Sequence, residues 1–298
     1  MGKRAGLNMK LHLHTDGLIQ AYGPRLRSDQ LKIGLDLLGI DYTSDGTIGD
    51  VNVCIGSGAA FSRFNELPQC TPMGPNIIHD PLAHVPIVER FTNFIVQSDW
   101  VADLWRYYSP ELCEGKKFFS WPFSVDLDFW KRNPDTDPKQ EVDALWYTKY
   151  QNSQNRHLVE DLLKQQNQTY TTVSYKEYTP EQLRHECCRV KYAIFQSCCE
   201  KSPHAMLEIL AMGVPVFVVD SQRWIGDDSF DRATSAPYFD TELCGDVNVP
   251  DKTMVEAFYK FRQAERLVKY NPRSFAERYT IESSTQILID IVKECHGI

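Results

Sequence analysis

The chain has 298 residues, of which 42% are hydrophobic and 24% are charged, as in an ordinary globular protein. This length is enough for one large core or two smaller ones, and we expect two domains. The formal net charge of −8 argues against tight non-specific binding to a polyanion.

Local features bound the class of protein further. Residues 1–32 carry six Lys/Arg against two Asp, a local excess of +4 that keeps an anionic acceptor possible. No apolar run approaches the roughly 20 residues of a membrane-spanning helix, and the N-terminus lacks the apolar core of a secretory signal. The nine cysteines form no C-x-x-C pair, which favours reduced thiols in the cytoplasm and predicts no metal site.

The first predicted strand, residues 9–14, ends in a His-x-His pattern that Asp16 follows. Side chains alternate along a strand, so His12 and His14 lie on one face and could share a metal ion, as in a metal-dependent hydrolase. The other interpretation is an ordinary buried strand. The remaining histidines form no second His-x-His pattern, so the hydrolase is disfavoured.

The rest of the first part alternates between strand-like and helical patterns, as α/β proteins do. Strands are predicted at 51–55, 76–79 and 93–97, and helices at 28–38 and 99–108. A segment rich in Pro and Asp follows, which predicts an N-terminal Rossmann-like domain over 1–120 and a linker over 121–142.

The second part repeats the alternation with stronger patterns. Strands are predicted at 143–147, 169–174, 191–197 and 214–219, with helices at 155–166, from Thr179-Pro180 onward, and at 203–212. Long helices between 251 and 295 close the chain. We therefore predict a second Rossmann-like domain over 143–280 and a closing helix over 281–298 that packs on the first domain.

The stretch IFQSCCEKSPHAMLEILAMGVPVFVVD, residues 194–220, carries the most information. A buried strand ends, a short polar loop follows, and a helix begins, for which Ser202 suits the N-cap and Pro203 the first turn. Gly213 ends this helix. Free N–H groups at such a helix start attract anions, and Glu200 and Glu208 flank it.

Glu-x7-Glu followed by Ala-Met-Gly-Val-Pro-Val resembles the donor-binding signature of retaining GT-B glycosyltransferases. The resemblance implies two Rossmann-like domains with parallel sheets facing a cleft. It implies that Glu200 contacts the transferred sugar and that Glu208 holds the ribose hydroxyls of the nucleotide. The turn at 202–205, with Ser202, His204 and Ala205, would meet the phosphate. Pro203 departs from the family, which usually has Gly there.

The resemblance covers most of the chain. FFSWPFSVDLDFW resembles the interdomain segment of the family, and FIVQSDWVADLWRYY resembles the last strand and helix of its first domain. NPRSFAERYTIESSTQILIDIVKE resembles the closing helices, the last of which returns to the first domain. The first 50 residues match least.

Further site residues follow from the same resemblance. Cations that stabilise the leaving diphosphate lie just after the first strand of the second domain, where this chain has Lys149 and Arg156. His79 stands where the family places a histidine that faces the sugar. Tyr178 is a candidate for packing on the nucleobase, and His14 and Asp16 would line the acceptor side.

The leading hypothesis is a glycosyltransferase that moves a sugar from a nucleotide-diphosphate sugar to an unidentified acceptor, with retention and with no metal or other cofactor. The acceptor could be a glycan, a lipid, a small molecule or a modified DNA base, the last as in a viral or phage enzyme. The chain could instead be a nucleotide-sugar epimerase of the same fold, or a non-catalytic relative that binds sugar nucleotides.

Overall fold

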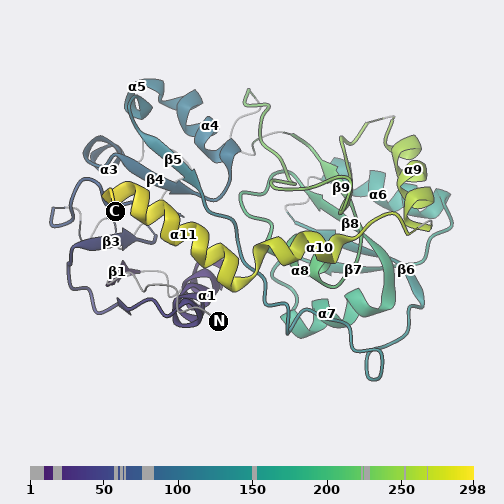
Figure 1. The fold of residues 1–298 in the computed structure, drawn as a ribbon. Coiled ribbons are helices and arrows are strands. Elements are labelled where there is room, and N and C mark those ends of the chain that lie inside the picture. The colour runs from purple at the N-terminus through teal and green to yellow at the C-terminus, as the bar shows by residue number, and fades with distance from the viewer. Residues whose placement is uncertain are drawn as a thin grey trace. The chain divides into compact units, whose positions relative to one another are not determined.

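Parallel strands separated by helices make up most of the described part of the chain (Figure 1). The computed structural model describes residues 10–15, 22–56, 60, 63, 65–75, 84–149, 153–222, 224, 229–251, 253–266 and 268–298. The chain divides into two compact units, one formed by Met1–Ser124 with Ile281–Ile298 and the other by Val125–Thr280. Each unit has its own parallel sheet and its own core, which confirms the predicted α/β class.

The sheet of the first unit is built around its earliest strand. β1 (Leu11–His14) pairs in parallel with β2 (Tyr42–Thr43) on one side and with β3 (Val51–Cys54) on the other. Met73 continues the sheet by bridging Cys54 and Phe94, and β4 (Asn93–Val96) then pairs with β5 (Lys117–Ser120). The chain thus adds strands first to one side of β1 and then to the other, the doubly wound arrangement.

Helices cover this sheet with apolar side chains. α1 (Tyr22–Leu38) and α11 (Ile281–His296) pack against each other, and both contribute to the core that contains Leu11, Leu13 and Val53 (Figure 1). The remaining helices described in this unit are α3 (Val85–Arg90), α4 (Asp99–Tyr108) and α5 (Pro110–Cys113). The indole N–H of Trp121 donates to the Ser284 carbonyl at 2.9 Å, which fixes the start of α11 in the first unit.

Gly34 of α1 packs directly against α11. A Cβ atom at this position would lie 1.9 Å from the hydroxyl oxygen of Thr285. We therefore expect Gly34→Ala to lower the free energy of unfolding by about 1–3 kcal/mol, because helix packing has no room for the methyl group. Urea unfolding measures this loss. Gly23→Ala, in the same helix but with open space around it, is the matched control, and equal stability of both variants would contradict the packing argument.

The second unit has a five-stranded parallel sheet in the order β10-β9-β8-β6-β7. Its strands are β6 (Val142–Thr148), β7 (Tyr170–Ser174), β8 (Val190–Ser197), β9 (Val216–Asp220) and β10 (Gly245–Asn248). β7 lies on one side of β6, and the next three strands follow on the other side. The order therefore reverses between β6 and β8, and ligands of such sheets bind outside the carboxyl ends of the strands at that reversal.

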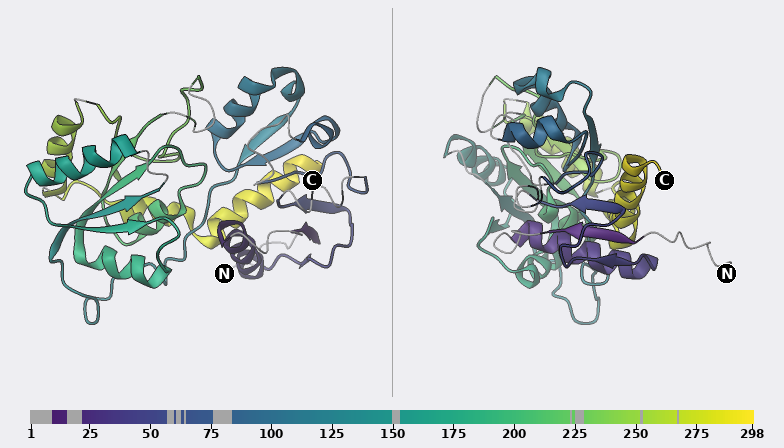
Figure 2. Two further views of the ribbon diagram at one scale, coloured as in Figure 1. Left: turned by 180° about the vertical axis from the view of Figure 1, so that it is seen from behind. Right: turned by 90° about the vertical axis from the view of Figure 1, so that its left-hand side faces the viewer.

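Successive side chains along β6 belong alternately to two separate hydrophobic cores, one on each face of the sheet. Ala144 and Trp146 point to the face covered by α6 (Ser153–Gln165) and α9 (Met254–Arg266), and Leu145 and Tyr147 to the opposite face. That opposite face carries α7 (Pro180–Arg189), α8 (His204–Ala211) and α10 (Pro272–Ala276), and Figure 2 shows helices on both sides of this sheet. A 3₁₀ turn (Glu277–Tyr279) then leads to α11.

Two arginines connect the chain that follows Val125 to the ends of α7 and α8. The Arg273 guanidinium donates to the carbonyls of Ala211 at 2.6 Å and Trp130 at 2.8 Å. The Arg132 guanidinium donates to the carbonyl of Cys187 at 2.9 Å. Val125 also donates its N–H to the Tyr279 carbonyl at 2.9 Å, so the chain enters and leaves the second unit at neighbouring positions.

The predicted elements differ from the observed ones mainly at their ends and at the sheet edges. α4 has the predicted bounds, whereas α1 begins at Tyr22, six residues before the predicted start at 28. β2, β5, β10, α3 and α5 were not predicted. The strand predicted at 76–79 lies outside the described residues.

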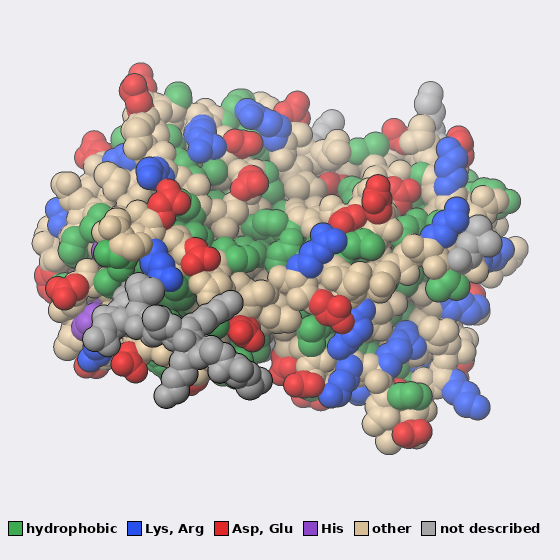
Figure 3. Space-filling model, viewed as in Figure 1, with side chains coloured by type: hydrophobic (Ala, Val, Ile, Leu, Met, Phe, Trp, Pro, Cys, Tyr) green, Lys and Arg blue, Asp and Glu red, His purple; other side chains and the backbone are tan. Residues whose placement is uncertain are grey.

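The visible surface carries charges of both signs, and Figure 3 shows Lys and Arg interspersed with Asp and Glu. Such mixing is consistent with the modest negative net charge of −8. No helix in the described part of the chain combines the length and apolar character that crossing a membrane requires.

Candidate functional site

The candidate site lies in the second unit, where the strand order reverses. Thr148 at the end of β6 pairs with Gln196 near the end of β8, and the Lys149 N–H donates to the Gln196 carbonyl at 2.9 Å. This register brings the residues that follow the two strands to the same edge of the sheet. Lys149 and Glu200, 51 positions apart in the sequence, meet there.

Lys149 and Glu200 form a buried ion pair. The Lys149 Nζ atom lies 2.8 Å from Glu200 Oε2, and the two side chains are 15% and 5% exposed. The Ser197 hydroxyl donates to the other carboxylate oxygen at 3.1 Å. Burial raises the pKa of Glu200, and Lys149 and Ser197 oppose that rise by stabilising the carboxylate.

A network of hydrogen bonds holds the loop that carries Glu200. The Glu200 N–H donates to the Thr234 carbonyl at 2.8 Å, and the Ser235 hydroxyl donates to the Ser197 carbonyl at 2.6 Å. Asp220, at the end of β9, accepts from both Thr234 and Ser235. The backbone of this loop is therefore held by Thr234 and Ser235, which Asp220 at the end of β9 positions in turn.

Helix α8 begins one residue later than the sequence predicts. Its first residue is His204, and its N-cap is Pro203, whose ψ of 76° lies outside the helical range. The prediction that Ser202 is the N-cap and Pro203 part of the first turn is therefore wrong. The His204 N–H donates back to the Ser202 carbonyl at 2.9 Å, so a tight turn precedes the helix. Ala205 lies in its first turn, and Gly213, with φ of 74°, ends it as predicted.

Glu208 is a buried carboxyl group on α8 that faces His204 one turn earlier. The His204 Nε2 atom lies 3.5 Å from Glu208 Oε1, and the Glu208 side chain is 7% exposed. Burial raises the pKa of Glu208 to about 8. The group is thus largely protonated at neutral pH and able to give up its proton when a partner for the carboxylate arrives.

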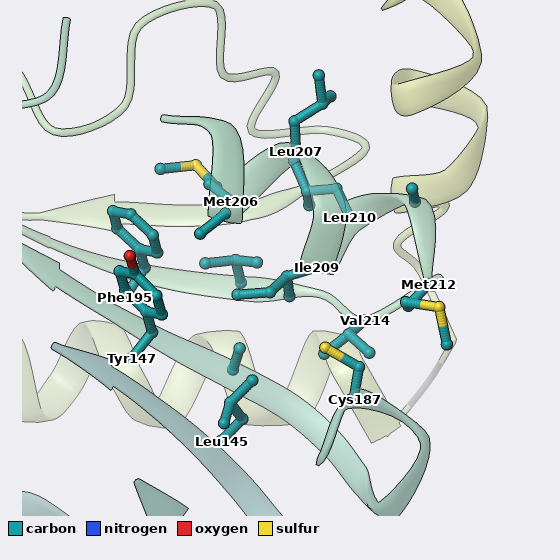
Figure 4. Packing of buried hydrophobic residues seen from close by; sticks show 14 of the residues in the cluster. Leu145, Tyr147, Cys187, Phe195, Met206, Leu207, Ile209, Leu210, Met212 and Val214 are labelled. Carbon is teal, nitrogen blue, oxygen red and sulfur yellow. The ribbon is translucent and has the colours of Figure 1, made fainter. Parts of the chain in front are cut away.

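Aromatic rings lie beneath and beside these charged groups. Tyr147 of β6 stacks on Phe195 of β8 with ring centroids 4.8 Å apart, and Figure 4 shows the two side chains lying together under α8. Tyr178 packs edge-on against Tyr147 at 5.9 Å. The Lys149 ammonium also lies 4.4 Å from the ring centre of Tyr175, so the loop between β7 and α7 places an aromatic ring next to the ion pair.

Sequence reasoning missed several residues that shape this site. Tyr147 was not among the predicted site residues, yet burial together with Tyr178 and the nearby Glu200 and Glu208 raises its pKa well above the usual range. Lys201 was missed as well: its ammonium lies 5.0 Å from the ring centre of Trp224, and burial lowers its pKa to about 8. Only its position directly after Glu200 could have drawn attention to it.

Three of the predicted site residues cannot be placed at this site. His79 and Asp16 lie outside the described residues. Arg156 belongs to α6, which follows β6, but its side chain is not among those the structure describes.

His14 and His12 lie in the first unit and have partners there. The buried His14 ring approaches Asn52 of β3, with Nε2 3.1 Å from Oδ1. His12 Nδ1 lies 3.0 Å from the Thr47 carbonyl oxygen. Among the residues with described side chains, no group of three or more His, Cys, Asp or Glu is arranged to hold a metal ion.

The fold built from these two units is the GT-B fold. The chain is similar to the solved structure of sucrose-phosphate synthase from Thermosynechococcus elongatus, with a TM-score of 0.60, 11% identity, and coverage of 97% of this chain and 99% of that one. A lipopolysaccharide outer core galactosyltransferase gives a TM-score of 0.58 at 12% identity, covering 96% and 99% of the two chains.

A glycosyltransferase involved in avilamycin A biosynthesis gives a TM-score of 0.56 at 12% identity and covers 97% and 98% of the two chains. At these identities the similarity establishes the fold. No protein-family model and no curated protein sequence matches the chain.

Proposed function

We propose that the protein is a glycosyltransferase that transfers a sugar from a nucleotide-diphosphate sugar to an acceptor with retention of configuration. The single observation that carries this proposal is the Lys149–Glu200 pair at the strand-order reversal, where Glu200 lies in the loop that leads into α8, the helix that carries Glu208. The GT-B fold supports the proposal, because the similar structures named above include transferases of sugars.

The charges of the site suit a diphosphate leaving group. Breaking the bond between the sugar and the diphosphate leaves negative charge on a phosphate oxygen, which nearby fixed cations stabilise. An ammonium can donate to such an oxygen while it stays beside a carboxylate, as Lys149 stays beside Glu200. In the proposal, the amides of the first turn of α8, at Ala205 and beyond, face the same diphosphate.

The carboxylates take different roles because their surroundings differ. Glu200, held by Lys149 and Ser197, would accept hydrogen bonds from hydroxyl groups of the transferred sugar. Glu208, which lacks so close a cation, would accept from the two ribose hydroxyls of the nucleotide once it loses its proton. Tyr178 would lie beside the base, and His14, His79, Asp16 and Arg156 keep their predicted roles within the proposal.

The proposed reaction is a front-face substitution. The bond from the anomeric carbon to the phosphate oxygen breaks, a bond to the acceptor oxygen forms on the same face, and the acceptor proton passes to the leaving phosphate. This route uses no carboxylate nucleophile, in contrast to most retaining glycosidases. We further propose that it uses no metal, since cationic side chains supply the positive field, and that the protein acts in the cytoplasm, where thiols stay reduced.

A thermal-shift screen with UDP-, GDP- and ADP-sugars tests the donor site directly. A nucleotide at about 100 times its Kd stabilises the native state by about 2.7 kcal/mol, which corresponds to a rise of a few degrees in Tm. We expect one nucleotide series to raise the Tm of the wild type and to leave that of Glu208→Ala unchanged.

The control for this screen is Glu181→Gln, which alters an exposed carboxylate in the first turn of α7. It should respond to nucleotides as the wild type does. A wild type that responds to none of the three series would overturn the proposed function.

A further inference from the structure

Two adjacent cysteines directly precede Glu200. Cys198 and Cys199 follow the end of β8 and are not joined in a disulfide, with Cys198 partly exposed and Cys199 buried. Nothing in the proposed transfer reaction uses either sulfur. Their position raises the question of what a change at these sulfurs would do to the carboxylate beside them.

The two thiols interact with each other and differ in reactivity. The neighbouring Cys199 side chain and backbone N–H groups stabilise the Cys198 thiolate, so that the pKa of Cys198 falls to about 7 although burial opposes the shift. At neutral pH a large fraction of Cys198 is therefore thiolate, the form that reacts with oxidants. Cys199, the next residue in the chain, supplies a second thiol that can resolve an oxidised Cys198.

The other adjacent pair in the chain provides an internal comparison. Cys187 and Cys188 are both buried at the end of α7, and burial raises the pKa of Cys187 well above its usual value and that of Cys188 to about 11. These thiols stay protonated at neutral pH. The same Cys-Cys sequence thus gives a reactive pair at Cys198 and Cys199 and an inert pair at Cys187 and Cys188.

The backbone of the reactive pair is tied to the candidate site by hydroxyl groups. The Ser221 hydroxyl donates to the Cys198 carbonyl at 2.5 Å, and the Ser197 hydroxyl lies 3.3 Å from the Cys199 carbonyl. The same Ser197 hydroxyl donates to the Glu200 carboxylate at 3.1 Å. A shift of the Cys199 carbonyl therefore disturbs the Ser197 hydroxyl, which holds the Glu200 carboxylate.

A disulfide between these neighbours would force such a shift of the backbone. The Cα atoms of adjacent residues lie about 3.8 Å apart across a trans peptide, which is shorter than the roughly 4.4–6.8 Å of ordinary disulfides. Closing the ring must therefore distort the peptide group between the two cysteines, and the backbone that continues to the Cys199 carbonyl shifts with it. Strained disulfides of this kind are also the ones that thiols reduce most readily.

We propose that Cys198 and Cys199 form a site of reversible oxidation by hydroperoxides, and that the resulting disulfide abolishes donor binding by displacing Glu200. In the first step, the Cys198 thiolate attacks the peroxide, which gives a sulfenic acid and releases hydroxide or an alkoxide. In the second, the Cys199 thiol attacks that sulfur, the disulfide forms and water leaves. The effect on donor binding rests on the proposed function, whereas the oxidation itself does not.

Trypsin separates the two cysteine pairs, which gives a direct test on the full chain. Cleavage after Lys191 and Lys201 yields a peptide with Cys198 and Cys199, and cleavage after Arg184 and Arg189 yields one with Cys187 and Cys188. After brief treatment with hydrogen peroxide and alkylation, we expect the first peptide to lose two hydrogens and take up no alkyl group. The second peptide should be alkylated twice. Dithiothreitol should reverse the change.

Nucleotide binding is measured on the same samples by thermal shift. Peroxide should remove the Tm rise caused by the nucleotide that stabilises the reduced protein, and dithiothreitol should restore it. Cys198→Ser should bind this nucleotide with or without peroxide. Cys188→Ser, which alters the buried pair, should bind the nucleotide when reduced and lose binding after peroxide, as the wild type does.

The outcomes separate this inference from the proposed function. Alkylation of both Cys198 and Cys199 after peroxide would overturn the inference, as would a disulfide that leaves nucleotide binding intact. A reduced protein that no nucleotide stabilises would instead overturn the proposed function and, with it, the effect on donor binding. The mass measurement then still decides whether the pair oxidises.

Discussion

Lys149→Ala is expected to lower kcat for release of the nucleoside diphosphate by about 100- to 1000-fold, the typical cost of removing one group that stabilises charge in a transition state. The ammonium 2.8 Å from Glu200 is the cation that we assign to the leaving phosphate. The rate is measured with the sugar nucleotide that gives the largest thermal shift. The variant should also lose about 3 kcal/mol of stability, because Glu200 remains buried without this partner.

Two further variants separate the catalytic effect from the structural one. Lys176→Ala is the matched control, because Lys176 lies 5.4 Å from the centre of the same Tyr175 ring but is exposed and makes no described ion pair with Glu200. Its kcat should equal that of the wild type. Lys149→Met combined with Glu200→Gln should recover stability without recovering kcat. A kcat of Lys149→Ala within about threefold of the wild type, in folded protein, would refute the assignment, since it falls far short of the loss expected from a charge-stabilising group.

Glu208→Gln is expected to remove a pH dependence of stability. The pKa of Glu208 rises from an ordinary value of 4.5 to about 8 in the folded protein because the group is buried. The folded state therefore holds a proton that the unfolded chain releases, so stability is present below about pH 4.5 and is lost as the pH rises towards about 8. The slope of the loss is at most about 1.4 kcal/mol per pH unit.

Urea unfolding of both proteins between about pH 5 and 8 measures this difference, because the two pKa values of Glu208 bracket that range. The free energy of unfolding of Glu208→Gln should rise relative to the wild type as the pH increases. His204, Tyr147 and Cys187 face Glu208 and are the same in both proteins, so their titration cancels to first order. Parallel curves for the two proteins across this range would show that Glu208 is ionised throughout. Glu181→Gln, which alters an exposed group, should follow the wild type.

The alternation of strands and helices could be predicted because each buried strand and amphipathic helix has a clear period. α4 was predicted to the residue, since an apolar face runs through it and Pro110 follows closely. The capping box of Thr179 and Gln182 likewise marks the start of α7. β2, β5 and β10 escaped prediction because they are short strands with many partly exposed residues, so no buried periodic pattern distinguishes them from loops.

The candidate site could be predicted only in part. Glu200 and Glu208 stand out because a resemblance to known proteins gives their spacing a meaning, and Lys149 stands out by its position after a strand. The contact between Lys149 and Glu200 depends on the pairing of β6 with β8, which no local pattern encodes. The hydrogen bonds that join Thr234 and Ser235 to the loop of Glu200 likewise connect residues that are far apart in the sequence.

The place of α11 in the first unit has a consequence for the order in which the protein is made. The second unit is one continuous segment, Val125–Thr280, so all of it leaves the ribosome before α11 does. Until then, the apolar face of α1 and the strands beside it lack Leu288, Ile289 and Val292. The part of the molecule synthesised first is therefore completed last, and its unfinished core must stay soluble while the rest of the chain is translated.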